Sequence, residues 1–211
     1  MKSSRWALLA VCAGLLLARP SLAADDEGWV SLFDGKTLGG WTQKNGTATY
    51  VVDDGTILGT TAKGSPNSFL CTDKNYADFE LEFEVLLDPR LNSGVQIRSE
   101  STKEYQNGRV HGYQVEIATG NAAGYIYDEA RRGWLSTDRK PHDAWKSGQW
   151  NKYRVVCQGD SIKTWLNGVA VADLKDDMTK TGFIAMQVHG FAGDPPAWVR
   201  WRNIRIKELA K

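Results

Sequence analysis

Apolar and polar residues alternate along much of the chain with a period of two, which is the spacing of β-strands that bury one face. The clearest run covers residues 79–85, Phe-Glu-Leu-Glu-Phe-Glu-Val. Its four apolar side chains share one side and its three glutamates share the other. We interpret the glutamates as the solvated face of a half-buried strand and assign them no chemistry.

Further segments show the same alternation, or a short apolar run, between residues that favour turns. They predict strands over residues 50–52, 57–59, 68–72, 94–99, 113–118, 124–127, 152–158, 161–166, 169–174, 182–188 and 199–207. A dozen short strands with one expected helical turn, near residues 177–180, predict an all-β protein of two packed antiparallel sheets, a sandwich or jelly roll.

Two local signals refine this prediction. Asn167-Gly168 separates two strand segments, and this dipeptide adopts the positive φ angles of a tight hairpin. In the last segment the apolar positions change parity after Trp201, so we expect a β-bulge near Arg202-Asn203.

The N-terminus has the layout of a secretory signal peptide. Lys2 and Arg5 precede an apolar run over residues 6–18, and Ser21-Leu22-Ala23 supplies the small residues of a cleavage site. We therefore expect a signal peptide over 1–23, a single domain over 24–211, and export with no membrane anchor after cleavage. The alternative is a buried N-terminal helix, which Arg19-Pro20 would end.

Composition narrows the function. The chain has 211 residues, enough for one domain, and 26 Lys plus Arg against 25 Asp plus Glu. This balance argues against nucleic acid as a partner. Nine Trp and 21 Gly favour a β-domain that grips a flat ligand such as a sugar ring. Cleavage would leave Cys71 and Cys157, which either pair or stay as separate buried thiols.

Several segments, taken in order, resemble the 3-keto-disaccharide hydrolase domain family over nearly all of the mature chain. They are residues 32–41, 92–99, 112–117, 150–155, 165–168, 182–190 and 199–206. The resemblance implies a concanavalin A-like jelly roll, bacterial export to the periplasm or the medium, and action on glycosides whose C3 hydroxyl is oxidised to a ketone.

A C3 ketone acidifies the C2 hydrogen, so a base can remove that proton, expel the C1 substituent and leave an alkene to which water adds. The net result is glycoside hydrolysis. Such a site needs a base, an acid beside the glycosidic oxygen and a donor for the enolate oxygen. A lectin-like binding module without turnover is the alternative function, and it needs only aromatic and hydrogen-bonding side chains.

Strand parity selects the candidate residues. If the strands near 94–99, 113–118 and 182–188 are neighbours, their outward side chains share one concave surface. There we expect Glu116 as the base, His189 as base or acid, and Arg98 as the clamp on the enolate, with Gln96, Gln114 and Gln187 binding substrate. The alternatives are an Arg98–Glu116 ion pair and a turn histidine bonded to backbone.

A second group of candidates follows in the next segment, where aromatic rings and charges could stack on sugar rings and bind hydroxyls. It comprises Tyr127, Asp128, Glu129, Arg132 and Trp134. The alternative is a solvated loop with aromatics packed beneath it, which we expect at least for Tyr125. We expect His111 to be exposed.

Metal and cofactor chemistry have little support, because the chain has no zinc, EF-hand, P-loop or dinucleotide spacing. We predict no cofactor. A structural Ca²⁺ on Asp34 or Asp53-Asp54 is a weaker alternative to their role as turn formers. The sequence leaves the oligomeric state open.

Overall fold

The structure, a computed structural model, describes residues 27–210. The predicted signal peptide over 1–23 lies outside them. The described residues form fifteen strands: β1 (Trp29–Ser31), β2 (Trp41–Lys44), β3 (Thr49–Asp53), β4 (Thr56–Thr60), β5 (Ser68–Thr72), β6 (Phe79–Leu87), β7 (Ser93–Glu100), β8 (His111–Ile117), β9 (Ile126–Glu129), β10 (Gly133–Trp134), β11 (Asn151–Gln158), β12 (Ser161–Leu166), β13 (Val169–Lys175), β14 (Phe183–Val188) and β15 (Trp198–Glu208). They contain no helix, and so none that could cross a membrane.

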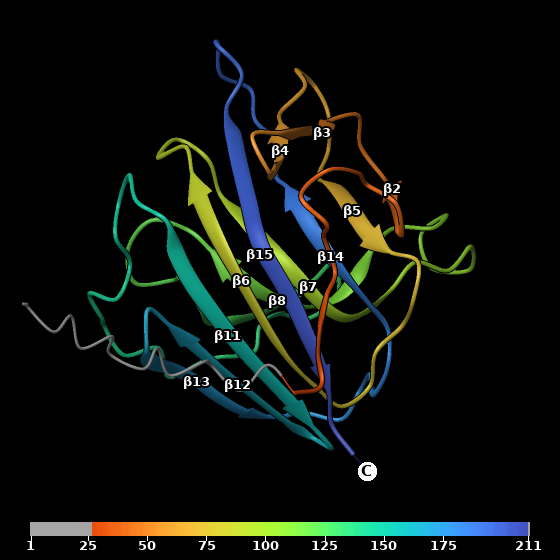
Figure 1. Cartoon of the computed structure of the whole chain (residues 1–211), viewed down its shortest axis with the longest axis vertical. Coiled ribbons are helices and arrows are strands. Elements are labelled where there is room, and N and C mark those ends of the chain that lie inside the picture. The colour runs from red at the N-terminus through yellow and green to blue at the C-terminus, as the bar shows by residue number, and fades with distance from the viewer. Residues whose placement is uncertain (1–26, 211) are drawn as a thin grey trace, which may run out of the picture.

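The strands pair into two antiparallel sheets that lie one in front of the other in Figure 1. Sheet A has the order β13-β12-β11-β6-β15-β4-β3, with β1 added against β15. Sheet B has the order β10-β9-β8-β7-β14-β5-β2. This is the predicted all-β, jelly-roll type of sandwich.

The core lies between the sheets because each long strand turns its apolar parity inward. Phe83 of sheet A stacks on Tyr153 with ring centroids 4.9 Å apart, and both are fully buried. From sheet B, Val95, Val115 and Met186 are equally buried. The opposite parity of sheet B is therefore free to carry polar groups on its outer face.

The predicted strands correspond to twelve of the observed ones, with ends that differ by up to two residues. Asn167 and Gly168 have φ angles of 49° and 84°, and the register of β15 shifts between Arg202 and Arg205, so the hairpin and the bulge are confirmed. The predicted turn of helix over 177–180 is absent. Strands β1, β2 and β10 were not predicted, because they have two to four residues and too little alternation to detect.

Cys71 and Cys157 are both buried free thiols, on β5 of sheet B and β11 of sheet A. Burial raises the pKa of each thiol to about 12. The structure thus corresponds to separate thiols, and the disulfide alternative is wrong.

Candidate functional site

The outer face of sheet B carries a cluster of buried polar side chains, which we call the polar face. As predicted, β8, β7 and β14 are neighbours, and Gly94 lies opposite Glu116 while Gln96 lies opposite Gln114. A side chain at Gly94 would come within 2.3 Å of the Gln114 side chain, so the glycine lets Gln114 lie across β7.

Amide side chains link the polar face into one network. The Ser99 hydroxyl donates to Gln96 Oε1 (2.8 Å), and Gln96 Nε2 donates to Gln114 Oε1 (2.6 Å). Gln187 Nε2 donates to the same Gln114 oxygen at 2.8 Å. The three glutamines are at most 2% exposed. This chain of hydrogen bonds fixes which end of each amide is the donor.

The network ends on two carboxylates, each of which accepts from one glutamine and one asparagine. Glu116 accepts from Gln114 Nε2 at 3.0 Å and from Asn92 Nδ2. Glu129 accepts from Gln187 Nε2 and from Asn67 Nδ2, both at 3.4 Å. Both glutamates are less than 10% exposed. Because the donors of these hydrogen bonds are neutral amides, the bonds orient the carboxylates without neutralising their charge.

Burial raises the pKa of Glu116 and of Glu129 above the ordinary value of a glutamate. The amide donors oppose this shift for both, as does the charge that half-buried His189 can carry, and Arg109 opposes it for Glu129. His189 Nδ1 donates to the carbonyl of Gly190 at 2.8 Å, so Nε2 is the nitrogen that can exchange a proton. The charge of the imidazole, when it is present, therefore acts to lower the pKa of both carboxyls.

The polar face is hollow. Glu129 on β9 contacts Asn67, which precedes β5, although three strands separate β9 from β5 in the sheet. Flat strands would place them roughly 19 Å apart, at ~4.8 Å per strand. The sheet and the loop before β5 must therefore curve around this face. A cleft of about 540 Å³ opens beside the contact, and its walls include Glu129, Asn67, Arg109 and Asn45.

Tyr127 and Trp134 extend the polar face at its β10 edge. Tyr127 lies opposite Gln114, and Trp134 lies opposite Tyr127, so the three side chains project from the same side. The two rings meet edge to face with centroids 5.3 Å apart. Both are half-buried, which leaves aromatic surface for a ligand.

One polar atom of the network has no partner. Gln187 Oε1 is buried and accepts no hydrogen bond, while its amide nitrogen is bound to both Gln114 and Glu129. Flipping the amide would point its oxygen at two acceptors, so the orientation is fixed. A buried carbonyl without a donor costs about 1–3 kcal/mol.

The expectation that Arg98 shares this face is wrong. A bulge between Ile97 and Glu100, with Arg98 at φ 46°, turns its side chain to the opposite side. The fully buried guanidinium donates to the carbonyls of Ala77 (2.6 Å) and Gly159 (2.8 Å) and to Asp78 (2.8 Å). The alternative of an Arg98–Glu116 ion pair is wrong for the same reason.

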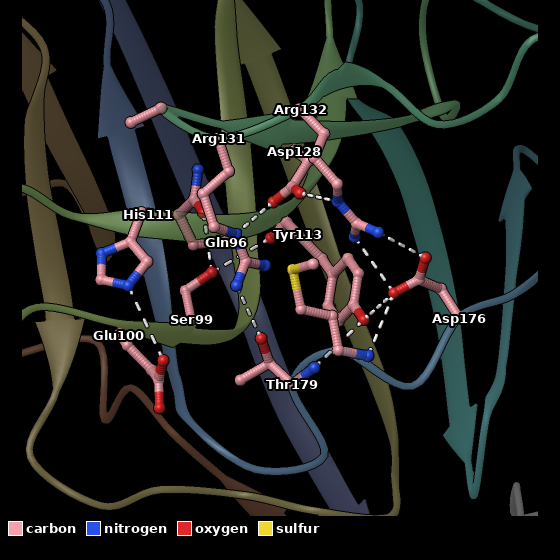
Figure 2. A network of polar contacts seen from close by, with 12 residues as sticks. Gln96, Ser99, Glu100, His111, Tyr113, Asp128, Arg131, Arg132, Asp176 and Thr179 are labelled. Atoms are coloured by element: carbon pink, nitrogen blue, oxygen red, sulfur yellow. Dashed lines mark hydrogen bonds and ion pairs between the residues drawn. The ribbon is translucent and has the colours of Figure 1, made fainter. Parts of the chain in front are cut away.

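Asp128 and Arg132 also face away from the polar face. Asp128 lies opposite the core-facing Tyr113 and is fully buried. Figure 2 shows it bound to Arg131 and Arg132, with Arg132 bridging to Asp176 at 2.8 Å. This network ties β8 and β9 to the segment before β14. The expectation that these two residues line a sugar site is therefore wrong.

Of the expectations for His111 and Tyr125, one is wrong and one is confirmed. His111 is 5% exposed and stacks on Tyr105 with centroids 3.8 Å apart, so the expectation that it is exposed is wrong. Tyr125 is buried, as predicted, and its hydroxyl donates to the carbonyl of Lys140.

Sequence reasoning missed four residues of the site: Asn45, Asn67, Asn92 and Arg109. Asn92 stands in an Asn-Ser-Gly segment that favours a turn, which hid its contact with Glu116. The other three lie in loops, where no periodicity indicates the direction of a side chain.

Residues 27–210 contain no cluster of three or more acidic, His or Cys side chains placed to hold a metal ion. Asp34 accepts hydrogen bonds from the backbone nitrogens of Lys36 and Thr37, both at 2.7 Å, which is the role of a turn former.

Jelly-roll sandwiches include lectin domains, and this one carries a hollow, amide-lined face with two buried carboxyls and aromatic rings. Residues 28–207 match the family model of the 3-keto-alpha-glucoside-1,2-lyase-like domain, and the chain belongs to that family.

The chain is similar in sequence or in structure to three known proteins. It is 22% identical to the 3-keto-disaccharide hydrolase of Bacteroides thetaiotaomicron over 89% of this chain and 81% of the other. A crystal structure from Parabacteroides distasonis, assigned as a glycosyl hydrolase, has a TM-score of 0.66 at 20% identity, covering 87% and 95% of the chains. The carbohydrate-binding module CBM66 of Bacillus subtilis has a TM-score of 0.52 at 20% identity, covering 80% and 96%. At these identities the two structures show the fold alone.

Proposed function

We propose that this protein is an exported enzyme that cleaves 3-keto-glycosides, such as 3-keto-disaccharides, by elimination across C1–C2 followed by addition of water. The observation that carries the proposal is the pair of buried carboxylates on the polar face, each held by an asparagine and a glutamine. Family membership and the relative from Bacteroides thetaiotaomicron support the substrate class. The signal-peptide pattern of residues 1–23 supports export.

The chemistry requires a base for the C2 proton. Carboxylates whose pKa burial has raised are better bases near neutral pH than exposed ones, and their amide partners hold them in place without supplying a competing proton. The C2–H electron pair moves toward the C3 oxygen and then forms the C1–C2 double bond as the C1–O bond breaks.

The leaving oxygen needs a proton, and His189 in its charged form can donate one from Nε2. Water then adds its oxygen to C1, the base returns its proton to C2, and His189 recovers a proton from the water. Substrate plus water thus becomes a 3-keto sugar and a free alcohol. Gln96, Gln114 and Gln187 orient the carboxylates, and Tyr127 and Trp134 supply ring surface for the sugar.

The test compares a 3-keto-disaccharide with its unoxidised parent. We expect release of a 3-keto sugar from the first and nothing from the second, because only the ketone acidifies C2. The double variant Glu116→Gln/Glu129→Gln and the single variant His189→Ala should each lose at least about 100-fold in turnover. Binding of the ketone by wild-type protein without turnover would contradict the proposal and favour a lectin-like module.

A further inference from the structure

Arg98 does not reach the polar face, so the enolate would need another positive group. Arg109 lies at the cleft, with Nη2 3.9 Å from Glu129 Oε1 and Nη1 donating to Gln106 at 3.1 Å. A guanidinium has five N–H donors, more than these two side-chain partners within residues 27–210 can occupy. Arg109 can therefore bind a ligand oxygen without leaving Glu129.

The backbone on both sides of Arg109 is fixed. Asn45 Oδ1 accepts from the backbone nitrogen of Val110 at 2.7 Å, and Asn45 Nδ2 donates to the carbonyl of Gly108 at 3.1 Å. The Arg109 carbonyl accepts from His111 Nδ1 at 2.9 Å. The side chain itself is 53% exposed. An accessible cation on an anchored backbone is a preorganised donor, because the loop need not reorganise to use it.

Glu129 is also the carboxylate of the pair that lines the cleft. In a 3-keto sugar, C2 with its proton and the C3 oxygen belong to adjacent carbons. The base and the enolate donor must therefore stand side by side, each within about 3 Å of its target. Glu129 and Arg109 are spaced in this way. Glu116 has no cationic side chain within ion-pair distance in the described chain.

We infer that, within the proposed reaction, Glu129 removes the C2 proton and Arg109 binds the C3 oxygen on which the negative charge develops. This assignment rests on the proposed function. It makes Glu129 and Arg109 the catalytic pair for deprotonation, Asn45 a positioning residue that fixes Arg109, and Glu116 the neighbouring carboxylate that is not the base.

The assignment can be tested on the deprotonation step alone with a 3-keto-1,5-anhydro sugar, which has no C1 leaving group. Its C2 proton exchanges with D₂O whenever the base acts, and NMR follows the loss of the signal. We expect Glu129→Gln to lose this exchange at least about 100-fold, while Glu116→Gln retains it within about tenfold. The reverse order of the two variants would overturn the choice of base.

Arg109→Ala should lower the exchange rate by about 100-fold or more, which is the usual effect of removing one oxyanion donor. Arg109→Lys should recover part of the rate. Added guanidinium ion should rescue Arg109→Ala, because the residue is exposed and the cleft is open. Lys103→Ala is the matched control, since it removes a positive charge from the same loop.

An Arg109→Ala variant that keeps exchange and turnover within about threefold of wild type, or that gains nothing from guanidinium, would overturn the role of Arg109. Wild-type protein that neither turns over a 3-keto-disaccharide nor exchanges the C2 proton would instead contradict the proposed function. The two failures are therefore distinguishable. Melting temperatures of all variants separate loss of function from loss of fold.

Discussion

The outer faces of the two sheets carry the same sequence pattern but differ in the partners of their glutamates. On sheet A, Glu80, Glu82 and Glu84 alternate with core residues of β6 and bind Arg154, Arg205 and Arg202. On sheet B, Glu116 and Glu129 alternate with core residues in the same way and bind chiefly amides. Alternation therefore locates a polar face, and the charge of the partners decides whether that face is a solvated surface or a reactive one.

The pKa directions express this difference. Burial acts to raise the pKa of Glu82, but hydrogen bonds from Lys152 and Arg205 outweigh it and leave the value below the ordinary one. For Glu116 and Glu129 burial prevails. The hydrogen bonds to both come from neutral amides, which stabilise a carboxylate less than cations do, and the charge of Arg109, 3.9 Å from Glu129, opposes the shift without reversing it. The outer face of sheet A is thus a ladder of ion pairs, and the polar face of sheet B holds carboxyls whose pKa is raised.

The largest difference in stability that we expect is between the loss of a buried arginine and the loss of a partly exposed one. Arg98→Met removes the charged donor of Asp78 and of two backbone carbonyls, although Asp78 keeps the backbone nitrogen of Gly159, and we expect a loss of about 3 kcal/mol in the free energy of unfolding. Arg154→Met removes a side chain that is 40% exposed and paired with Glu80, and should cost about 0–1 kcal/mol. Urea denaturation measures both. Equal losses would contradict the distinction between the two environments.

Strand parity was enough to predict the centre of the site from the sequence. Gln96, Gln114, Glu116 and Gln187 lie on strands whose apolar residues alternate without interruption up to the positions concerned, and His189 directly follows β14. The same rule applied to β9 separates its residues, with Tyr127 and Glu129 on the polar face and Asp128 inside. Grouping residues 127–134 as one set of candidates mixed the two faces.

Parity failed where the backbone left the regular strand. The bulge at Arg98 turns this one side chain of β7 to the opposite face. The sequence Gln-Ile-Arg-Ser contains no residue that would predict the positive φ angle of Arg98. Arg109, Asn67 and Asn45 reach the site from loops, whose course depends on tertiary contacts such as those of Asn45 with Gly108 and Val110. The longer strands were predictable, and the loop residues that line the cleft were not.

The next expected effect is on the pH dependence of stability. Replacing a glutamate by glutamine should change the free energy of unfolding with pH in opposite directions on the two faces. A carboxyl whose folded pKa is raised makes the protein less stable as pH rises from the ordinary value of 4.5 through the folded value. Replacing Glu116 by Gln removes this loss, so the stability of Glu116→Gln relative to wild type should increase with pH over that window. The measurement is urea denaturation from pH 4 to 8.

Glu82→Gln provides the opposite case. Because the pKa of Glu82 is lowered, its contribution is fully present above pH 4.5 and is lost as pH falls through the folded value. The variant should be less stable than wild type at neutral pH and should approach it in acid. If both variants show the same trend, the partners of the carboxylates do not set their proton affinity.

The smallest expected effect tests whether the ladder on sheet A contributes to the site at all. Lys152 Nζ lies 3.0 Å from Glu82 Oε1 and is 53% exposed, and Glu82 keeps Arg205 when Lys152 is replaced. Lys152→Met should therefore change the free energy of unfolding by about 0–1 kcal/mol, less at high salt, because exposed ion pairs are screened. Its turnover of a 3-keto-disaccharide should equal that of wild type. A loss of turnover with stability unchanged would show that the ligand also contacts sheet A, and the polar face of sheet B could then no longer be treated as the whole site.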